Sequence, residues 1–431
     1  MNSKSSLRPD IPRRPIELVD MPARTVSHSG VSPYDASKPD YDAVTLRAER
    51  LRKTRDMMAV HDLDAIVLLE PNNQRYATGS RNMFGYFLRN STRYIYIPRS
   101  GPIVLFEYPG SAHISTWLET IDESRTSKMV FATVNGRDAS VMKPFAAEIL
   151  DLLIRDAATG RRVGMDRCFM MPAEALRAVG IDVVDIYNPM LDTRRLKTPG
   201  EIACLSLSMS AAEAGVWQVE RNIQPGVTEN ELFADMYRAL IAAGGEFIET
   251  RLLSSGPKTN PWFNEAGDRR VRPGELVAFD TDAIGCNGYY ADFSRTFLCG
   301  DHKPSAYQKM LYRLSHDQIR YNEDMIKPGM TFREISEKAW PIPQRFYDRR
   351  YSSVVHGVGL HGEKPIIAHL ADFDRFTGDG VLEPGMVISI ESFIGEVDGP
   401  EGVKLENQYL VTPTGLSAMC NYPFDERLLA D

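Results

Sequence analysis

The sequence predicts two domains in tandem, a smaller α/β domain followed by a larger domain of mixed helices and strands. A chain of 431 residues is longer than one hydrophobic core usually organises. Strand and helix patterns alternate over residues 43–190, as they do in α/β domains. Beyond a Pro-containing boundary at residues 193–205, helical patterns alternate with strand-rich segments. We therefore expect domains over residues 43–195 and 196–431, after an N-terminal arm over residues 1–42.

The composition is that of a globular protein, with 43% hydrophobic and 25% charged residues. A net charge of −8 argues against general nucleic-acid binding through a basic surface. The five cysteines are scattered and form no CxxC motif, which argues against a disulfide framework and a zinc finger. We see no secretory signal and no apolar segment of the roughly 20 residues that a membrane helix needs. A reducing cytoplasm is the expected location, with no membrane partner.

The first domain begins with a helical pattern over residues 41–63. Apolar, β-branched segments then predict strands, with a turn at Ser100–Gly101–Pro102 between the second and the third. A further helix is expected over residues 143–157. The predicted strands cover residues 65–70, 93–99, 102–108, 128–134, 161–166 and 183–187.

The second domain begins at a helix start signal. Thr198 precedes a proline and stands three residues before Glu201, which is the spacing of a capping box. A loop rich in Gly, Pro and Asn is expected over residues 254–267, followed by strands. The predicted helices cover residues 199–222, 228–243, 304–326 and 331–348.

Three aspartates lie in one short stretch, "FDTDAIGCNGYYADF", over residues 279–293. It is typical of a hairpin, with "AIGCNG" as the turn. Alternation along a strand would place Asp280 and Asp282 on one face, and Asp292 would lie opposite on the return strand. Converging carboxylates repel one another, and burial without a partner is costly, so divalent cations are the expected neutralising partners.

Later segments supply groups that could complete such a metal site. His356 lies in "HGVGL", Glu391 follows an apolar strand, and Glu406 interrupts another one. Carboxylates with one imidazole suit Mn, Fe, Co or Zn, and a pair of such ions is a known catalytic arrangement. Taken singly, each aspartate could be a cap, the histidine a core residue and each glutamate a salt-bridge partner. Their joint occurrence in successive strands favours two divalent metal ions per chain.

At these residues the chain resembles the "pita-bread" metalloenzymes, which include methionine aminopeptidase, aminopeptidase P, prolidase and creatinase. The matching segments are "YYADFSRTF", "HGVG", "LEPGMVISIES" and "VKLENQYLVTPTG". The resemblance implies a pita-bread α+β catalytic domain behind a creatinase-type α/β domain. It also implies a homodimer, in which the N-terminal domain of one subunit covers the site of the other. The ligands that it implies are Asp280, Asp292, His356, Glu391 and Glu406.

A narrower resemblance connects the chain to the dimethylsulfoniopropionate (DMSP) lyases of this fold, through "GGEFIETRLLSSGPKTNPWFNEAG", "FDTD", "HGVGL" and "YPFD". It implies that Asp282 also holds the metals and that Tyr351 faces the substrate. Two positions depart from the lyase pattern. Gly362 stands where the lyases have an aspartate base, which leaves His361 or Glu363 as the substitute. Tyr86 stands where the lyases have a tryptophan near the cationic group of the substrate.

Three functions follow from these patterns. In the first, a lyase eliminates the onium group from a small carboxylate, within a pocket formed by Tyr86, Trp262, Phe263 and Tyr351; loop packing is an equally good explanation for the Trp–Phe pair. In the second, the metals activate water for hydrolysis of a C–N bond. In the third, the fold is a non-catalytic binding module. Arg251 either contacts substrate or forms a structural salt bridge.

Overall fold

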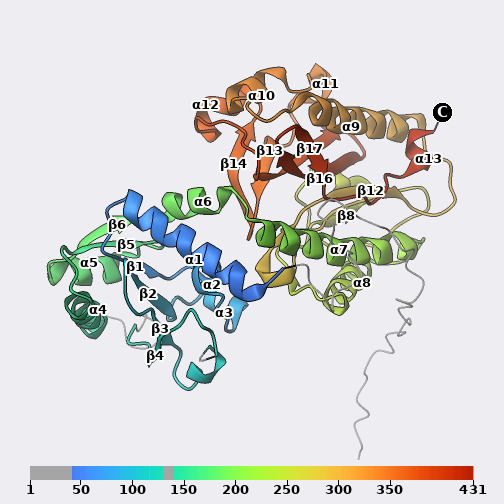
Figure 1. The fold of residues 1–431 in the computed structure, drawn as a ribbon. Coiled ribbons are helices and arrows are strands. Elements are labelled where there is room, and N and C mark those ends of the chain that lie inside the picture. Colours follow the sequence, from blue (N-terminus) through green and yellow to red (C-terminus); the bar gives the residue numbers. More distant parts are fainter. Residues whose placement is uncertain (1–40, 116, 130–138, 431) are drawn as a thin grey trace, which may run out of the picture.

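The computed structural model describes residues 41–115, 117–129 and 139–430, and the expected N-terminal arm lies almost wholly outside this range. Two bodies follow one another along the chain (Figure 1). The first, coloured blue to green, is an α/β domain. The second, coloured green to red, is an α+β domain in which helices lie on both sides of stacked sheets. In the part that is described, no helix is long and apolar enough to cross a membrane.

The N-terminal domain is built on a six-stranded sheet of order β4-β3-β2-β1-β5-β6. Alternate residues of β1 face opposite sides: Ile66 and Leu68 pack toward helix α1, and Ala65 and Val67 pack toward α4 and α5. The strands are β1 (Ala65–Leu68), β2 (Tyr94–Pro98), β3 (Val104–Glu107), β4 (Glu123–Thr126), β5 (Arg162–Met165) and β6 (Asp182–Asp185). The helices are α1 (Ala43–Val60), α2 (Pro71–Thr78), α3 (Phe84–Phe87), α4 (Lys143–Arg155), α5 (Met170–Ala178) and α6 (Tyr187–Arg195).

One strand of this domain was not predicted from the sequence pattern. β4 forms over Glu123–Thr126, parallel to β3, and precedes the strand predicted over residues 128–134. Lys128 and Met129 have no strand structure, and residues 130–134 lie outside the described range. The residues of β4 are polar and form a strand because they pair with β3, so a search for apolar segments does not find them.

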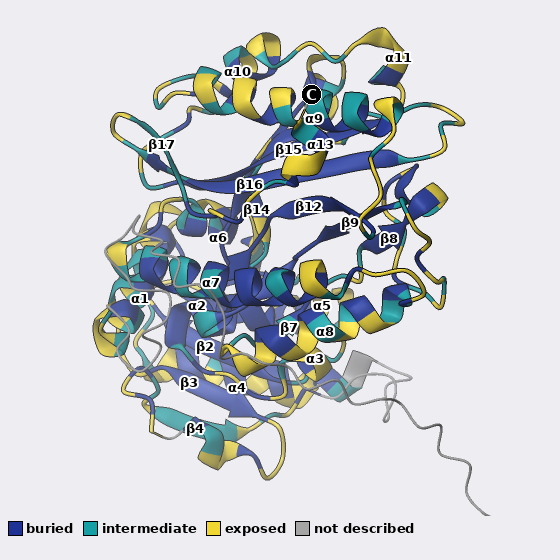
Figure 2. Ribbon diagram, turned by 90° about the vertical axis from the view of Figure 1, so that its right-hand side faces the viewer, coloured by how far each residue is buried: buried dark blue, intermediate teal, exposed yellow. Residues whose placement is uncertain are grey.

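The second domain begins with helix α7 (Pro199–Asn222), and the predicted capping box is confirmed. The Thr198 side chain accepts from the backbone N–H of Glu201, whose side chain accepts from the backbone N–H of Thr198. Helices α7 and α8 (Glu229–Ala242) cover one side of the sheets, and α9 (Ala306–Met325) covers the other, where it packs on β15 and β16 (Figure 2). The exposed faces of these helices point away from the buried sheets.

The helix predicted over residues 331–348 is wrong as a single element. It forms two short helices, α10 (Phe332–Lys338) and α11 (Gln344–Tyr347), which the segment "AWPIP" with Pro341 and Pro343 separates. Proline lacks a backbone N–H and its ring clashes with the preceding turn, so the helix ends before the prolines. Two further short helices are α12 (Phe373–Phe376) and α13 (Glu426–Leu429).

Three sheets form the interior of the second domain, of order β14-β13-β15-β16-β17, β12-β9-β8 and β11-β10-β7. Strand β16 packs against β12, which brings the first two sheets together. The strands are β7 (Phe247–Ile248), β8 (Leu253–Ser255), β9 (Leu276–Asp280), β10 (Ala283–Ile284), β11 (Tyr290–Ala291), β12 (Ser294–Leu298), β13 (Ser353–Val358), β14 (Gly362–Ala368), β15 (Val387–Gly395), β16 (Gly402–Thr412) and β17 (Gly415–Ala418).

Candidate metal centre

The three aspartates of the 279–293 stretch converge on the predicted antiparallel hairpin, whose ladder is interrupted at Asp282. Asp280 pairs with Ser294 and Ala283 pairs with Ala291, so one register runs through the hairpin and places Asp292 opposite Asp282. Asp280 ends β9, and Asp282 follows in a left-handed conformation with φ of 39°. The chain then enters a different small sheet through β10 and β11 before Asp292. One oxygen of each carboxylate lies within 4.8 Å of the others, and all three residues are buried. The unusual backbone at Asp282, rather than simple alternation, accounts for its direction.

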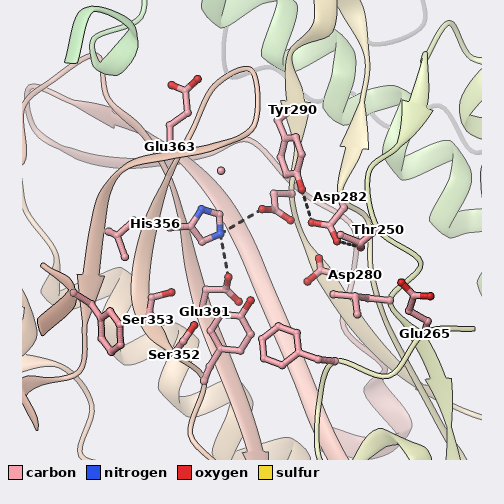
Figure 3. Close-up of a pocket in the computed structure, with 17 residues that line it drawn as sticks. Thr250, Glu265, Asp280, Asp282, Tyr290, Ser352, Ser353, His356, Glu363 and Glu391 are labelled. Atoms are coloured by element: carbon pink, nitrogen blue, oxygen red, sulfur yellow. Dashed lines mark hydrogen bonds and ion pairs between the residues drawn. The ribbon is translucent and has the colours of Figure 1, made fainter. Parts of the chain in front are cut away.

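The histidine and the two glutamates reach the same place from the large sheet. His356 lies on β13, and Glu391 and Glu406 face each other across the β15–β16 pair. The His356 Nε2 atom lies 3.0 Å from Glu391, 3.3 Å from Asp292 and 3.4 Å from Glu406. Figure 3 shows the imidazole pointing toward the carboxylates. The six residues that were predicted as metal ligands therefore form one cluster where two sheets meet.

Lys404 is a member of this cluster that the sequence interpretation did not identify. Its ammonium lies 2.6 Å from Glu391, 2.8 Å from Glu406 and 3.4 Å from Asp280, and the side chain is fully buried. Lys404 precedes Glu406 by two residues on the same strand, so both side chains face the same side. That i, i+2 spacing in "VKLEN" is the signal that could have revealed it.

The electrostatics of the cluster follow from burial and crowding. Burial and then the neighbouring Asp280 raise the pKa of Asp282 to about 7. Burial and then Glu406 raise the pKa of Asp292 well above its ordinary value. Burial opposes the charge on Lys404, but Asp280 and Glu391 still hold its pKa well above normal. The cluster therefore contains more carboxylate groups than positively charged groups, and it attracts further cations.

Two hydroxyl groups fix the direction of Asp282. The Tyr290 hydroxyl donates to one carboxylate oxygen at 2.5 Å, and the Thr250 hydroxyl donates to the other. Figure 3 shows Tyr290 pointing onto Asp282 from the side opposite to Asp280. Such hydrogen bonds orient a ligand in its metal-binding direction.

The donor set fits divalent metal ions. It offers carboxylate oxygens and one imidazole nitrogen, which suits Mn, Fe, Co and Zn. The Asp292 Oδ1 atom is buried and has no hydrogen-bond partner among the described residues. Asp280, Asp282, Asp292, His356, Glu391 and Glu406 would hold the ions.

A pocket of about 570 Å³ opens beside the cluster. Phe263, Tyr351 and Phe376 contribute aromatic walls, and Leu252 and Ile366 contribute aliphatic ones. The Tyr351 ring lies between Phe263, at a centroid distance of 5.6 Å, and the Lys404 ammonium, at 4.7 Å. Apolar walls with charged groups at one end suit a small polar-headed ligand.

The two candidate bases are both bound by Arg194, from helix α6. The Arg194 Nη2 atom lies 2.9 Å from the His361 Nε2 atom, and Arg194 Nε lies 3.0 Å from Glu363. Lys197 lies 3.6 Å from the second Glu363 oxygen. In Figure 3 the Glu363 carboxylate points away from the cluster. Burial opposes ionisation of Glu363, but Arg194 and Lys197 lower its pKa below the ordinary value.

Gly362, Glu363 and Glu265 all line the pocket, whereas His361 does not. Glu265 is exposed and adds a carboxylate to the lining that the sequence interpretation did not name. It lies in the predicted loop over residues 254–267, where spacing alone gave no reason to single it out.

Three residues predicted to bind substrate lie outside this pocket. Trp262 is 6% exposed and packs against Phe393, underneath the lining residue Phe263. Arg251 stacks on Phe233 and donates to the side-chain oxygen of Asn230, so its contacts are structural, but neither of them is the salt bridge that the alternative predicted. Tyr86 lies on α3 in the N-terminal domain, outside the pocket of its own chain.

Comparison with known proteins gives two family matches that divide the chain. Residues 50–194 match the creatinase/prolidase N-terminal domain, and residues 203–413 match metallopeptidase family M24. The dimethylsulfoniopropionate lyase DddP of Roseovarius nubinhibens is 33% identical, over 90% of this chain and 88% of that protein. A Xaa-Pro dipeptidase of Pyrococcus furiosus is 30% identical, over 53% of this chain and 64% of its own length.

A solved structure carries the same fold over most of its length. The Xaa-Pro dipeptidase from Bacillus anthracis superposes with a TM-score of 0.70 at 20% identity, covering 88% of this chain and 99% of that one. The α/β domain followed by a pita-bread domain is therefore the architecture of this chain, as the sequence resemblance predicted.

Proposed function

The chain belongs to metallopeptidase family M24, with a creatinase/prolidase-type domain before the catalytic domain, and from this premise we propose that it is a two-metal lyase. The substrate class is a small carboxylate with an onium group on its β-carbon, with DMSP as the first member to test. The reaction removes the α-proton and expels the onium group as a neutral leaving group. For DMSP the products are acrylate and dimethyl sulfide.

The observation that carries this proposal is the position of Asp282. Its carboxylate meets those of Asp280 and Asp292, and Tyr290 and Thr250 hydrogen-bond to it. The resemblance to the DMSP lyases implies that Asp282 holds the metals together with Asp280, whereas the wider resemblance, which includes prolidase, implies Asp280 without Asp282. The 33% identity to a DMSP lyase extends over both domains and supports the same assignment.

Bound metal ions would act as Lewis acids toward the substrate carboxylate and stabilise the negative charge that develops as the α-proton leaves. The aromatic walls supply the complementary end of the pocket. Phe263 is 60% exposed, so its ring is free to contact an onium group. The Tyr351 ring lies between Lys404 and Phe263 and lines the same pocket.

Proton removal requires a base near the pocket. Gly362 cannot serve, and we propose that Glu363 or His361 accepts the proton with Arg194 setting their direction. Glu363 lines the pocket but is paired with Arg194 and Lys197, which reduces its basicity. The exposed Glu265 is the third group to test.

A second candidate function is hydrolysis of a C–N bond, as the dipeptidase relatives suggest by name. The glycine at position 362 and the pairing of Glu363 with two cations favour it, because both weaken the lyase mechanism. In this alternative the same ligands hold the same metals, and the pocket would accept a dipeptide.

One experiment separates the two functions. The purified chain is assayed for metal content, for dimethyl sulfide release from DMSP, and for cleavage of Xaa-Pro dipeptides. Sulfide release that falls at least tenfold in Asp282→Asn supports the lyase proposal, with Asp301→Asn as the matched control in a loop outside the cluster. Dipeptide cleavage without sulfide release refutes it in favour of hydrolysis.

The base is then identified with Glu363→Gln, His361→Gln and Glu265→Gln. The variant that lowers kcat by about a hundredfold or more, with metal content unchanged, identifies the proton acceptor. Equal, small effects in all three would contradict the proposal that a side chain of this group takes the proton.

A further inference from the structure

Two of the five cysteines lie together outside the metal cluster. Cys204 is buried on helix α7, and Cys286 is half-buried in the short turn Cys286–Gly288 that joins β10 to β11. The two side chains are near enough for each thiol to shift the pKa of the other. The Asn287 Nδ2 atom contacts both sulfur atoms, at 3.5 Å and 3.8 Å. The two thiols therefore form a pair rather than two separate core cysteines.

The backbones that carry the pair are in close contact. Ser208 lies one helical turn after Cys204, and its hydroxyl donates to the Cys204 carbonyl at 2.9 Å. A β-carbon at Gly285 would lie 2.6 Å from the Ser208 Cα atom, so the turn lies directly on the helix. A disulfide requires Cα atoms roughly 4.4–6.8 Å apart, and backbones in contact allow such a spacing with small adjustments.

The two sulfur atoms differ in reactivity. The Cys204 thiol lowers the pKa of Cys286 to about 7, against the effect of burial, and the Tyr41 hydroxyl and the charge of Arg75 act in the same direction; Glu246 opposes them. Burial raises the pKa of Cys204 well above its ordinary value. Cys286 is thus the accessible thiolate, and Cys204 is the protected thiol behind it.

We propose that Cys286 and Cys204 are a peroxide-sensitive thiol pair that closes to a disulfide between α7 and the β10–β11 turn. The Cys286 thiolate attacks the O–O bond of hydrogen peroxide, forms an S–O bond and releases hydroxide, which gives the sulfenic acid. The Cys204 sulfur then attacks the Cys286 sulfur. The S–S bond forms, the S–O bond breaks, and the thiol proton leaves with the hydroxyl group as water. Two thiols lose two electrons, and one peroxide is reduced to two waters.

The pair is independent of the proposed reaction, because neither cysteine lines the pocket or contacts a ligand side chain among the described residues. The pair nevertheless lies on the part of the chain that connects two of the proposed metal ligands. The β10–β11 turn connects the segment after Asp282 to the segment before Asp292. A disulfide would fix this turn to α7.

The test uses the full chain with Cys168→Ser, because Cys168 is exposed and would consume peroxide on its own. Four of the five cysteines remain in this background. Hydrogen peroxide is added in small molar excess, the protein is unfolded, and free thiols are counted. Peptide mapping without reductant then locates any disulfide.

We expect the thiol count to fall from four to two, with one peptide pair that joins Cys204 to Cys286 and dissociates on reduction. Adding Cys286→Ser or Cys204→Ser should abolish that pair, and Cys299→Ser should leave it unchanged. The map of the Cys168→Ser protein already decides the matter if a further serine variant fails to fold. Stable sulfenic or sulfinic acid at Cys286 with Cys204 still free would overturn the proposal. A disulfide between two chains, or four unreacted thiols, would also overturn it.

Discussion

Lys404 is the internal cation of the metal centre, and its replacement by methionine tests whether it neutralises the ligand carboxylates. The ammonium contacts Glu391, Glu406 and Asp280 at 2.6, 2.8 and 3.4 Å in a fully buried setting. Removing one partner of a buried ion pair costs about 3–5 kcal/mol, because the remaining charges stay buried without compensation. We therefore expect the metal-free variant to lose about that much free energy of unfolding.

The assay is thermal unfolding of chelator-treated and metal-loaded protein, for the wild type and Lys404→Met. In a domain of about 200 residues, 1 kcal/mol shifts Tm by about 2–4 °C, so the metal-free variant should unfold about 6–20 °C lower. Bound metal ions bring positive charge to the same carboxylates, so the difference should shrink in the loaded protein. Metal should consequently raise Tm more in the variant than in the wild type.

Lys338→Met is the matched control, because Lys338 is 57% exposed and its partner Glu334 lies 3.8 Å away on the surface. Exposed pairs contribute about 0–1 kcal/mol, so this control should shift Tm little. The reasoning would be refuted if metal-free Lys404→Met kept the wild-type Tm. It would also be refuted if the deficit were the same with and without metal.

Three further predictions concern the same domain. Tyr290→Phe removes the hydroxyl that orients Asp282, so metal affinity, measured by competition with a chromogenic chelator, should fall about tenfold or more; an unchanged Kd would contradict this role. Burial and then Arg350 lower the pKa of His369 to about 4. Because the unfolded chain takes up this proton near pH 6.5 and the folded chain only near pH 4, stability should decrease by about 3 kcal/mol as pH falls through that window. In His369→Asn the urea midpoint should depend less on pH over this window than in the wild type. Parallel plots of midpoint against pH for the two proteins would rule the effect out. Dialysis against a chelator should abolish catalysis and lower Tm, and readdition of Mn²⁺, Fe²⁺, Co²⁺ or Zn²⁺ should restore both; activity that survives complete removal of metal would contradict a metal-dependent reaction.

Local patterns predicted most of the helices and the general composition of the centre. The capping box at Thr198 and the acidic residues within apolar strands are both visible at short sequence range. The hairpin forms as predicted, but the interruption of its ladder at Asp282, which divides its strands between two sheets, was not predictable in the same way. The interruption depends on the left-handed backbone conformation of Asp282, whose carboxylate accepts hydrogen bonds from Tyr290 and Thr250.

Polar contacts between residues far apart in the chain could not be predicted from the sequence either. Arg194 and His361 are separated by 167 positions in the chain, and no periodicity relates them. Trp262 illustrates the reverse case, since an aromatic pair in a loop predicted two pocket residues and the structure places only Phe263 in the pocket. Lys404 could have been predicted from the sequence, because alternation along a strand places its side chain on the same side as that of Glu406.

The position of Arg194 has a consequence for anyone who divides this protein. A cut at the predicted boundary, between residues 195 and 196, would leave this arginine on the N-terminal fragment and Glu363 on the other. The catalytic fragment would then contain a buried carboxylate whose remaining cation is Lys197, 3.6 Å away. Fragment complementation or domain exchange with a relative should therefore place the junction before helix α6, so that Tyr187–Arg195 stays with the C-terminal part.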